Sequence, residues 1–339
     1  GKGERFWPKS RVNMPKQFLS LTDDGKTMIQ LTVERISPLV DIKDVYVATN
    51  KNYRELVKQQ LPGIPEENIL CEPIGRNTAP CVGLGAVHVA TKYDDAVMIV
   101  LPSDHLIKNN EVFADTFKEG ANLVTVGITP NYPETGYGYI KYNQADKKNN
   151  AYSVEKFVEK PDLETAKSYL ADGTYLWNSG MFVWKVSTIL DCFKKFMPDT
   201  YEGLLKIKAA VGTADENAVL EAEFPNLESQ SVDYGIMEKA DSIYTLPGNF
   251  GWDDVGSWLA VGRIKKNDDN SNVINGNVVA VNTKGCVIEG GEKLIATVGL
   301  RDIVVVDTKD ATLITTKENA GEIKQVLAKL REEGKNEYL

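Results

Sequence analysis

Short apolar runs alternate with amphipathic stretches from about residue 45 to residue 250. The run 96–101 is almost continuously apolar, which is typical of a strand buried on both faces. This alternation of strand and helix patterns indicates an α/β fold with a mixed, mostly parallel sheet and helices on both faces. The other predicted strands are 45–49, 69–71, 123–128, 137–142, 154–158, 177–184 and 243–246.

Helical periodicity fills most of the intervals between these strands. A polar turn, 144–150, separates the strands 137–142 and 154–158, and Ser231 is placed to cap a helix that runs to Lys239. The remaining predicted helices are 53–61, 79–92, 113–119, 163–170, 188–196 and 201–211.

The pattern changes after about Lys266. A polar linker, 267–272, leads into short strand-like runs that are separated by turn signals such as Asn275-Gly276 and Gly290-Gly291. This texture predicts a small all-β module whose spacing suits the coils of a short β-helix, closed by a helix over 320–333. We therefore expect two domains, a catalytic domain 1–266 and a β-helix-like domain 267–339.

Composition excludes some classes of partner. The 339 residues carry a net charge of −9, so a broad nucleic-acid footprint is not expected. Neither a signal peptide nor an apolar run of membrane-spanning length is evident, and we expect a cytoplasmic protein without a membrane partner. With only two histidines, and four cysteines that lack metal-ligand spacing, a histidine- or cysteine-based metal site is not expected.

The first sixteen residues depart from this acidic balance, because they hold five cations against Glu4 alone. Gly1 and Gly3 allow the backbone to come close to a ligand, while Arg5 and Lys16 add full charges, as a polyphosphate requires. A solvated charged loop is the alternative. Such a turn usually follows a strand, which we expect before Gly1.

Two carboxylates are placed where a metal would be useful. Asp104 follows the most apolar strand, at the end where α/β sheets bind ligands, and Asp254 lies between tryptophans in WDDVGSW. Mg²⁺ prefers a couple of carboxylates together with substrate phosphates and water. Each aspartate could instead be a turn or helix cap.

Further polar groups could bind a sugar or a base. Gly138 lies in a glycine–tyrosine turn, Glu159 and Lys160 end a strand, and Asn178 lies inside an apolar strand, while the loop around Asn77 opens a helix and could hold a nucleobase. The structural alternatives are a tight turn, plain surface residues, internal hydrogen bonding and a capping loop.

Taken in chain order, these features resemble the sugar-1-phosphate nucleotidyltransferases, and within them the bacterial mannose-1-phosphate guanylyltransferases. The resemblance covers nearly the whole chain and is carried by ERFWP, PKQFL, NTAP, LPSDH, ETGYGYI, VEKPD, WNSGMF, VDYGIMEK and WDDVGSW. It implies a glycosyltransferase-A-like, Rossmann-like fold with a β-helical tail that makes homodimer contacts. It also implies a Mg²⁺-dependent reaction of mannose 1-phosphate with GTP that yields GDP-mannose and pyrophosphate by in-line attack.

The resemblance also implies roles for individual residues. Arg5, Lys16 and Lys160 would be catalytic, acting on the leaving pyrophosphate, the α-phosphate and the sugar phosphate, and Asp104 and Asp254 would hold Mg²⁺. The sugar would contact Tyr137, Gly138, Glu159, Lys160 and Asn178. The nucleotide would contact Gly1, Gly3, Glu4, Arg5, Lys16, Glu72, Asn77, Thr78 and Ser103.

The sequence departs from the family at Glu4, where many relatives carry threonine, and it includes no histidine-rich isomerase domain, so we expect one activity. Two alternatives remain at this stage. One is a nucleotidyltransferase for another NTP or sugar phosphate, and the other is a non-catalytic regulatory subunit of the same fold. A glycosyltransferase is less well supported, because no Asp-x-Asp motif ends a suitable strand.

Overall fold

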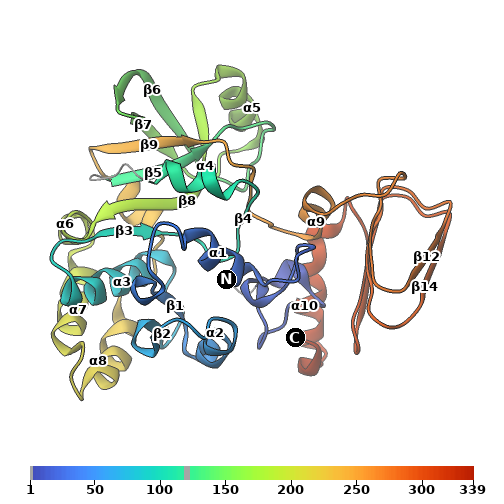
Figure 1. Ribbon diagram of the computed structural model, residues 1–339, viewed down its shortest axis with the longest axis horizontal. Coiled ribbons are helices and arrows are strands. Elements are labelled where there is room, and N and C mark those ends of the chain that lie inside the picture. The colour runs from blue at the N-terminus through green and yellow to red at the C-terminus, as the bar shows by residue number, and fades with distance from the viewer. Residues whose placement is uncertain (1–2, 118–122) are drawn as a thin grey trace. The chain divides into compact units, whose positions relative to one another are not determined.

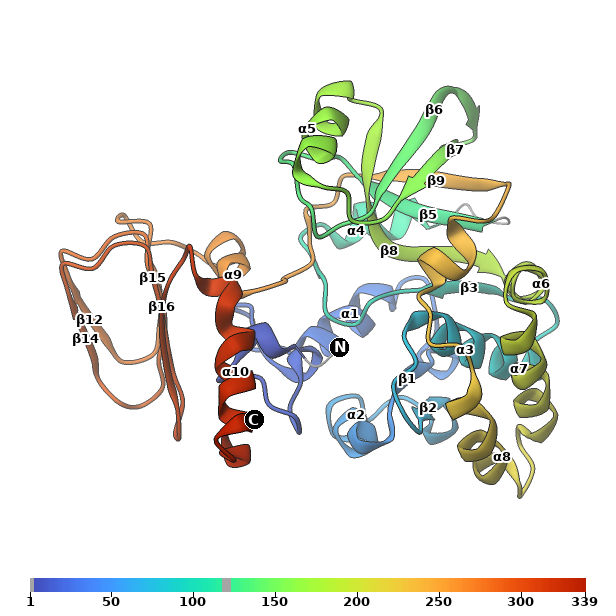
Figure 2. The same ribbon diagram turned by 180° about the vertical axis from the view of Figure 1, so that it is seen from behind.

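A computed structural model describes residues 3–117 and 123–339, and Figures 1 and 2 show it from two sides. Gly1 and the predicted helix end at residues 118–119 therefore lie outside the described residues. The chain divides into two compact units, which we name the sheet unit and the coil unit. The sheet unit is Arg35–Pro102 with Ile107–Trp252, and the coil unit is the chain up to Glu34 with Ser103–Leu106 and Asp253–Leu339. The predicted division at residue 266 stays a prediction.

The strands follow the predicted runs closely over most of the chain. They are β1 (Val47–Asn50), β2 (Ile69–Glu72), β3 (Val97–Val100), β4 (Leu106–Ile107), β5 (Leu123–Ile128), β6 (Tyr139–Lys148), β7 (Ala151–Val158), β8 (Tyr175–Lys185), β9 (Ile243–Gly248), β10 (Trp252–Asp253), β11 (Val273–Asn275), β12 (Val278–Val281), β13 (Val287–Glu289), β14 (Ile295–Val298), β15 (Ile303–Asp307) and β16 (Thr312–Thr316).

The α-helices include α1, α8 and α9, which the sequence pattern did not predict. They are α1 (Met28–Ile36), α2 (Arg54–Gln60), α3 (Thr78–Lys92), α4 (Asn110–Thr116), α5 (Leu163–Asp172), α6 (Val186–Phe196), α7 (Pro198–Ala210), α8 (Glu216–Glu223), α9 (Trp258–Ile264) and α10 (Ile323–Glu332). The short helices used below are η1 (Glu4–Phe6), η2 (Lys16–Phe18), the π-helix η7 (Asp233–Met237) and η8 (Ala320–Glu322). The others are η3 (Ile42–Asp44), η4 (Lys51–Tyr53), η5 (Glu66–Asn68), η6 (Phe224–Asn226) and η9 (Asn336–Tyr338).

A six-stranded sheet in the order β3-β8-β5-β9-β7-β6 is the centre of the sheet unit (Figure 1). Strands β3, β5 and β9 run in one direction, but β8 lies between β3 and β5 and is antiparallel to both. Strand β7 is antiparallel to β9, and β6 to β7. The α/β class and the mixed sheet are as predicted. The parallel majority is wrong for this sheet, because β8 separates strands that a simple βα alternation would make neighbours and β7 is antiparallel to both of its neighbours.

Helices cover both faces of this sheet, as predicted. On β8, Phe182 and Trp184 belong to a core cluster that includes residues of α3, α6 and α7. Met181 and Val183 point to the opposite face and join a cluster with residues of α4 and α5. The alternation follows from the two-residue period of a strand, and burial on both faces explains the continuous apolar runs in the sequence.

Two local predictions need correction. The polar segment 144–150 is mostly strand, since β6 continues to Lys148 and only Asn149 and Asn150 form the turn into β7. Asn149 takes a left-handed conformation, with φ of 54°, which asparagine tolerates well. The helix expected after Ser231 is the short π-helix η7, although Ser231 Oγ does accept a hydrogen bond from Tyr234 N at 3.2 Å.

The coil unit contains the predicted β-helical module. Strands β11, β13 and β15 stack in parallel and β12 pairs in parallel with β14, as in successive coils, while β16 closes the stack antiparallel to β15. Valines at equivalent positions, Val273, Val287 and Val304, enter one core together with Ile323 and Leu327 of α10. Among residues 3–117 and 123–339 there is no helix with the length and apolar character of a membrane span.

A buried carboxylate fastens the N-terminal segment to this module. Glu289 is 1% exposed, and its two oxygens accept hydrogen bonds from Lys9 Nζ at 2.5 Å, Lys265 Nζ at 2.7 Å and Asn275 Nδ2 at 3.0 Å. Burial alone would raise the pKa of the Glu289 carboxyl, but the Lys9 ammonium and these hydrogen bonds bring that pKa below its usual value. The carboxylate is therefore ionised at neutral pH and joins three segments of the coil unit.

We expect Glu289→Gln to lower the free energy of unfolding at pH 7.5 by about 3 kcal/mol, because two ammonium groups are left around a neutral amide. A depressed carboxyl pKa contributes stability that is fully present above the unfolded-state value of 4.5 and is lost as the pH falls through the lower folded-state pKa. The difference between the two proteins in urea denaturation should therefore shrink below pH 4.5.

Glu292→Gln is the matched control, because Glu292 is an exposed residue of the same module. It should change the free energy of unfolding by less than about 0.5 kcal/mol. Equal urea midpoints for the wild type and Glu289→Gln at pH 7.5 would show that the buried carboxylate does not fasten the module.

Candidate active site

The turn at the start of the coil unit is built on Gly3. Its φ is 61°, in the left-handed region, and a Cβ built there would lie 2.5 Å from Lys16 Cβ and 2.8 Å from Lys16 N. Only glycine permits this close approach of the two segments. The following helix η1 then turns Phe6 inward, where its ring meets Trp258 edge-on at 5.2 Å, and leaves Arg5 exposed.

Lys16 connects the two predicted metal ligands. Its side chain is buried, and its Nζ donates to the backbone oxygen of Asp254 at 2.6 Å and forms an ion pair with Asp104 Oδ2 at 3.1 Å. Burial would raise the pKa of the Asp104 carboxyl, but the Lys16 ammonium and His105 hold that pKa below its ordinary value. Asp104 is therefore an anion at neutral pH.

These residues line one cleft of about 300 Å³ within the coil unit. Its lining combines cations, carboxylates and close backbone, which is the chemistry that binds a polyphosphate with a metal ion. The lining residues are Gly3, Glu4, Arg5, Phe6, Lys16, Asp104, His105, Asp254, Gly256 and Lys324.

Asp254 is distinguished from its neighbour by its surroundings. Asp253 accepts hydrogen bonds from Arg263 at 3.0 and 3.1 Å and from Val255 N at 2.8 Å, so its carboxylate is a structural anchor. The Asp254 carboxylate instead lies over Gly256, where a Cβ would come within 2.7 Å of its Oδ2, and it lines the cleft.

The carboxylates of Asp104 and Asp254 suit a metal ion that binds together with a phosphate substrate. In the part of the chain that the structure describes, no group of three or more histidine, cysteine or acidic side chains is arranged to hold a metal ion. Two carboxylates nevertheless match Mg²⁺, which usually completes its shell with substrate phosphates and water. Asp104 and Asp254 fit such an ion only as part of a complex with a polyphosphate.

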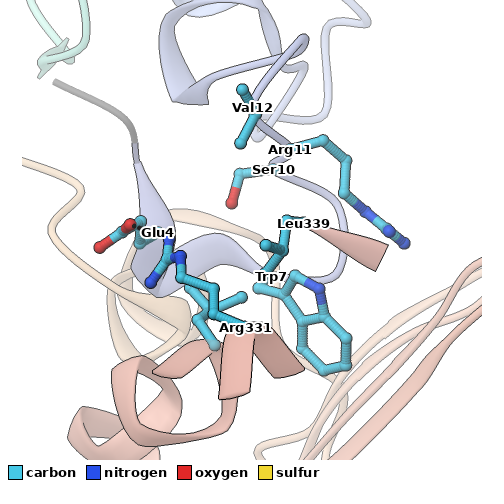
Figure 3. Close-up of a pocket in the computed structure, with 8 residues that line it drawn as sticks. Glu4, Trp7, Ser10, Arg11, Val12, Arg331 and Leu339 are labelled. Carbon is cyan, nitrogen blue, oxygen red and sulfur yellow. Dashed lines mark hydrogen bonds and ion pairs between the residues drawn. The ribbon is translucent and has the colours of Figure 1, made fainter. Parts of the chain in front are cut away.

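Glu4 and Ser103, two other predicted nucleotide-binding residues of this unit, have different surroundings. Glu4 lines the cleft, but its Oε1 accepts a hydrogen bond from Arg331 of α10 at 2.9 Å (Figure 3). Ser103 immediately precedes Asp104 and is not among the cleft-lining residues. A nucleotide contact by either side chain stays a prediction.

A second group of predicted residues lies in the sheet unit. A Cβ at Gly138 would lie 2.5 Å from Glu159 Oε2, so the missing side chain makes room for this carboxylate. The Gly138 carbonyl accepts a hydrogen bond from Asn178 N at 2.8 Å. The structure thus brings Gly138, Glu159 and Asn178 together, in a cluster that we call the carboxylate cluster and that also contains Asp233 and Lys160.

Asn178 is held by internal hydrogen bonds. Its Oδ1 accepts from Thr125 Oγ1 and from Gly180 N, both at 3.1 Å, and its Nδ2 donates to Asp233 Oδ1 at 2.9 Å. These contacts agree with the structural alternative, and a direct sugar contact stays a prediction.

Asp233 was missed by sequence reasoning, although the string VDYGIMEK contains it. Burial and the nearby negative charge of Glu159 raise the pKa of the Asp233 carboxyl to about 6. A carboxyl group whose pKa is raised in this way, next to a second carboxylate, is typical of a functional site. In the sequence, Asp233 stands as a single acidic residue between apolar residues, and this pattern is typical of a buried carboxylate.

Lys160 occupies an uncommon backbone position. Its φ is 46°, its N donates to Tyr137 O at 3.2 Å, and its Nζ forms an ion pair with Glu159 Oε1 at 2.6 Å. This hydrogen bond to Glu159 raises the pKa of the Lys160 ammonium, which therefore keeps its charge. The Tyr137 ring packs edge-on against Trp177 and Trp252, so its predicted sugar contact would use the ring edge or the hydroxyl.

The NTAP loop is a capping loop. The Asn77 side chain accepts from Thr78 N at 2.9 Å and caps α3, and Thr78 Oγ1 accepts from Val232 N at 2.9 Å. The loop is therefore fastened to the segment that leads into Asp233. Burial raises the pKa of the Glu72 carboxyl at the end of β2. Base or ribose contacts of Glu72, Asn77 and Thr78 stay predictions.

The predicted residues thus form two groups, one in each unit. The coil unit brings together Gly3, Glu4, Arg5, Lys16, Asp104 and Asp254 around one cleft. The sheet unit contains the carboxylate cluster and the NTAP loop. Sequence reasoning also missed four residues that line the cleft. Three of them stand in strings that carry the resemblance, Phe6 in ERFWP, His105 in LPSDH and Gly256 in WDDVGSW, whereas Lys324 stands in none.

Two family models match this chain. The nucleotidyl transferase model matches residues 1–271, and the model of the MannoseP isomerase/GMP-like beta-helix domain matches residues 276–330.

Curated relatives match over the whole chain. A mannose-1-phosphate guanylyltransferase of Klebsiella pneumoniae is 40% identical over 100% of this chain and 74% of its own length. One from Escherichia coli K12 is 38% identical over 100% of this chain and 73% of its own length.

A solved structure from Thermus thermophilus, named mannose-1-phosphate geranyltransferase, has a TM-score of 0.87 and 34% identity, and the match covers 98% of this chain and 97% of that one. The fold, the β-helical module and the full-length sequence similarity therefore all indicate the same family. The chain belongs to the nucleotidyl transferase family, among relatives that are named mannose-1-phosphate guanylyltransferases.

Proposed function

We propose that this chain is a mannose-1-phosphate guanylyltransferase, which makes GDP-mannose and pyrophosphate from mannose 1-phosphate and GTP. The observation that carries the proposal is one cleft lined by Arg5, Lys16, Asp104 and Asp254, in a chain 40% identical to such an enzyme over its full length. A non-catalytic subunit would have no need to combine these four charges in one cleft. In this proposal residues 1–266 act as the catalytic domain.

The reaction would be an in-line displacement at the α-phosphorus of GTP by a phosphate oxygen of mannose 1-phosphate. The protein's task is to position two anions and to neutralise the charge that develops on the leaving pyrophosphate. Arg5 would contact that pyrophosphate, and Lys16 would contact the α-phosphate. Mg²⁺, bound by Asp104 and Asp254 together with the phosphates, would supply further positive charge.

The carboxylate cluster would bind mannose 1-phosphate. Lys160 offers a charged donor for the sugar phosphate, while Glu159 and Asp233 offer acceptors for sugar hydroxyl groups. Gly138, Tyr137 and Asn178 would also contact the sugar. Gly3 and the adjacent backbone would cradle the phosphates, and Glu72, Asn77, Thr78 and Ser103 would contact the nucleoside.

The β-helical module would form a homodimer through the outer face of β12 and β14. Val279, Val281 and Val298 are 52%, 47% and 70% exposed, and Val281 pairs with Val298 in register. Exposed apolar side chains gathered on one strand pair are typical of a protein interface. A second copy of the same face would cover them.

We propose the cytoplasm as the location. All four cysteines are free thiols, and two of them, Cys81 and Cys192, have pKa values raised by burial, which makes them unreactive. Free, unpaired cysteines are usual in a reducing compartment.

The proposal is tested by measuring pyrophosphate release with GTP, ATP, UTP and CTP, each combined with mannose 1-phosphate and with glucose 1-phosphate. We expect GTP with mannose 1-phosphate to have the highest kcat/KM. Equal or higher kcat/KM with UTP and glucose 1-phosphate would overturn the specificity, and no turnover with any pair at saturating Mg²⁺ would favour a non-catalytic subunit.

Substitutions of the neighbouring residues Asp253 and Asp254 distinguish a defect in folding from a defect in metal binding. We expect Asp254→Asn to lower kcat by about 10²–10³-fold and to raise the Mg²⁺ concentration needed for half-maximal rate, because one charged metal ligand is lost. Asp253→Asn should chiefly lower the melting temperature, since it weakens the contact with Arg263. A Mg²⁺ requirement unchanged in Asp254→Asn, or shifted equally in both variants, would remove Asp254 from the metal site.

The proposed dimer face predicts the effect of a single charge. Val298→Lys should shift the protein from dimer to monomer in analytical ultracentrifugation at micromolar concentration, because an ammonium group would be buried against its own symmetry mate. Val97→Lys is the control, since Val97 is an equally apolar residue, 51% exposed, in the sheet unit. A monomeric wild type, or a Val298→Lys protein that remains dimeric, would contradict the assignment.

A further inference from the structure

Lys324 lines the same cleft as Arg5 and Lys16 but comes from the terminal helix α10, outside the catalytic domain expected from the sequence. Three side chains thus bring positive charge to this cleft besides any charge on His105. The Lys16 ammonium is already bound to Asp104 and to the Asp254 carbonyl. Across the described residues, Arg5 and Lys324 have no ion-pair partner, so their charge is available to an anionic ligand.

The position of Lys324 in its helix is unfavourable for folding alone. It lies near the N-terminal end of the helical segment that η8 and α10 form, where the helix dipole disfavours a cation, and the nearest acid of that segment is Glu322 of η8. Glu322, which precedes the helix, is hydrogen-bonded to Gln325. A lysine that brings no ion pair and opposes the dipole is better explained by a ligand than by helix stability.

The rest of α10 is fixed so that Lys324 faces the cleft. Ile323 and Leu327 are buried in the core of the coil unit. Arg331 follows Lys324 by about two turns, so both side chains lie on the same face of the helix, and Arg331 meets Glu4 at 2.9 Å (Figure 3). One face of α10 therefore runs along η1, with Arg331 on Glu4 and Lys324 at the cleft.

We propose that Lys324 binds the β- and γ-phosphates of the nucleotide and the pyrophosphate formed from them, an inference that rests on the proposed guanylyl transfer. Pyrophosphate carries several negative charges, and Arg5 by itself offers one. Lys324 adds a second cation to the same cleft from α10. The β-helical module then contributes a substrate-binding residue to the reaction.

The test compares Lys324→Gln with Lys329→Gln, which removes an exposed lysine from the same helix that does not line the cleft. We expect Lys324→Gln to raise the KM for GTP in the forward reaction and for pyrophosphate in the reverse reaction by about tenfold. The KM for mannose 1-phosphate should change less than about twofold, and Lys324→Arg should retain most of the affinity. Lys329→Gln should match the wild type.

Calorimetric binding of inorganic tripolyphosphate gives a readout that does not need turnover. Lys324→Gln should bind it about tenfold more weakly than the wild type, with an equal or higher melting temperature because the opposed charge is gone. Tripolyphosphate affinity equal to that of the wild type, or an equal loss in Lys329→Gln, would overturn the inference. If the wild type binds tripolyphosphate but transfers no guanylyl group, the proposed function fails and this comparison still decides the role of Lys324.

Discussion

The bonds of the Lys16 ammonium hold the coil unit together. Its partners, Asp104 and the Asp254 carbonyl, come from two segments that are distant in the chain. A buried ammonium without partners would cost several kcal/mol, so these segments are stable only together. The same ammonium keeps Asp104 ionised. One positive charge therefore both joins the segments of the coil unit and maintains the negative charge of Asp104 in the cleft. In the proposed reaction, the nucleotide phosphate would share this cation with Asp104 and the Asp254 carbonyl.

The sequence pattern predicted an element correctly where the local sequence alone determines its secondary structure. Continuous apolar runs identified strands buried on both faces, such as β5, and the turn signals after Lys266 identified the coils of the β-helix. The pattern could not give the position of β8. Its composition predicts a strand, but its insertion between β3 and β5 depends on packing between distant segments. The polar end of β6 was likewise read as turn, because pairing with β7, and not composition, makes it a strand.

The residues of the candidate site also differ in how far the local sequence predicted them. Gly3, Lys16, Asp104 and Asp254 stood in recognisable strings, and the fold gathers them around one cleft. Asp233 stood in the string VDYGIMEK and Lys324 in a predicted helix, but neither segment singled out the residue itself. The importance of Asp233 depends on its contact with Asn178, and that of Lys324 on its place in the cleft. A residue that no family string singles out is recognised only by its neighbours in the fold, which lie far away in sequence.

The pairing of α10 with η1 bears on how this architecture can evolve. Trp7 Nε1 and Arg11 Nη1 both donate to Tyr338 O, at 2.7 and 2.8 Å, and Arg331 meets Glu4. The N-terminal segment that begins at Gly3 and the far end of the β-helical module are therefore hydrogen-bonded to each other, although the sequence separates them by more than three hundred residues. Recombination that exchanged the module between relatives would also exchange one wall of the cleft. A substitution in either segment therefore acts on a surface that both segments build, and the module is not an interchangeable appendage.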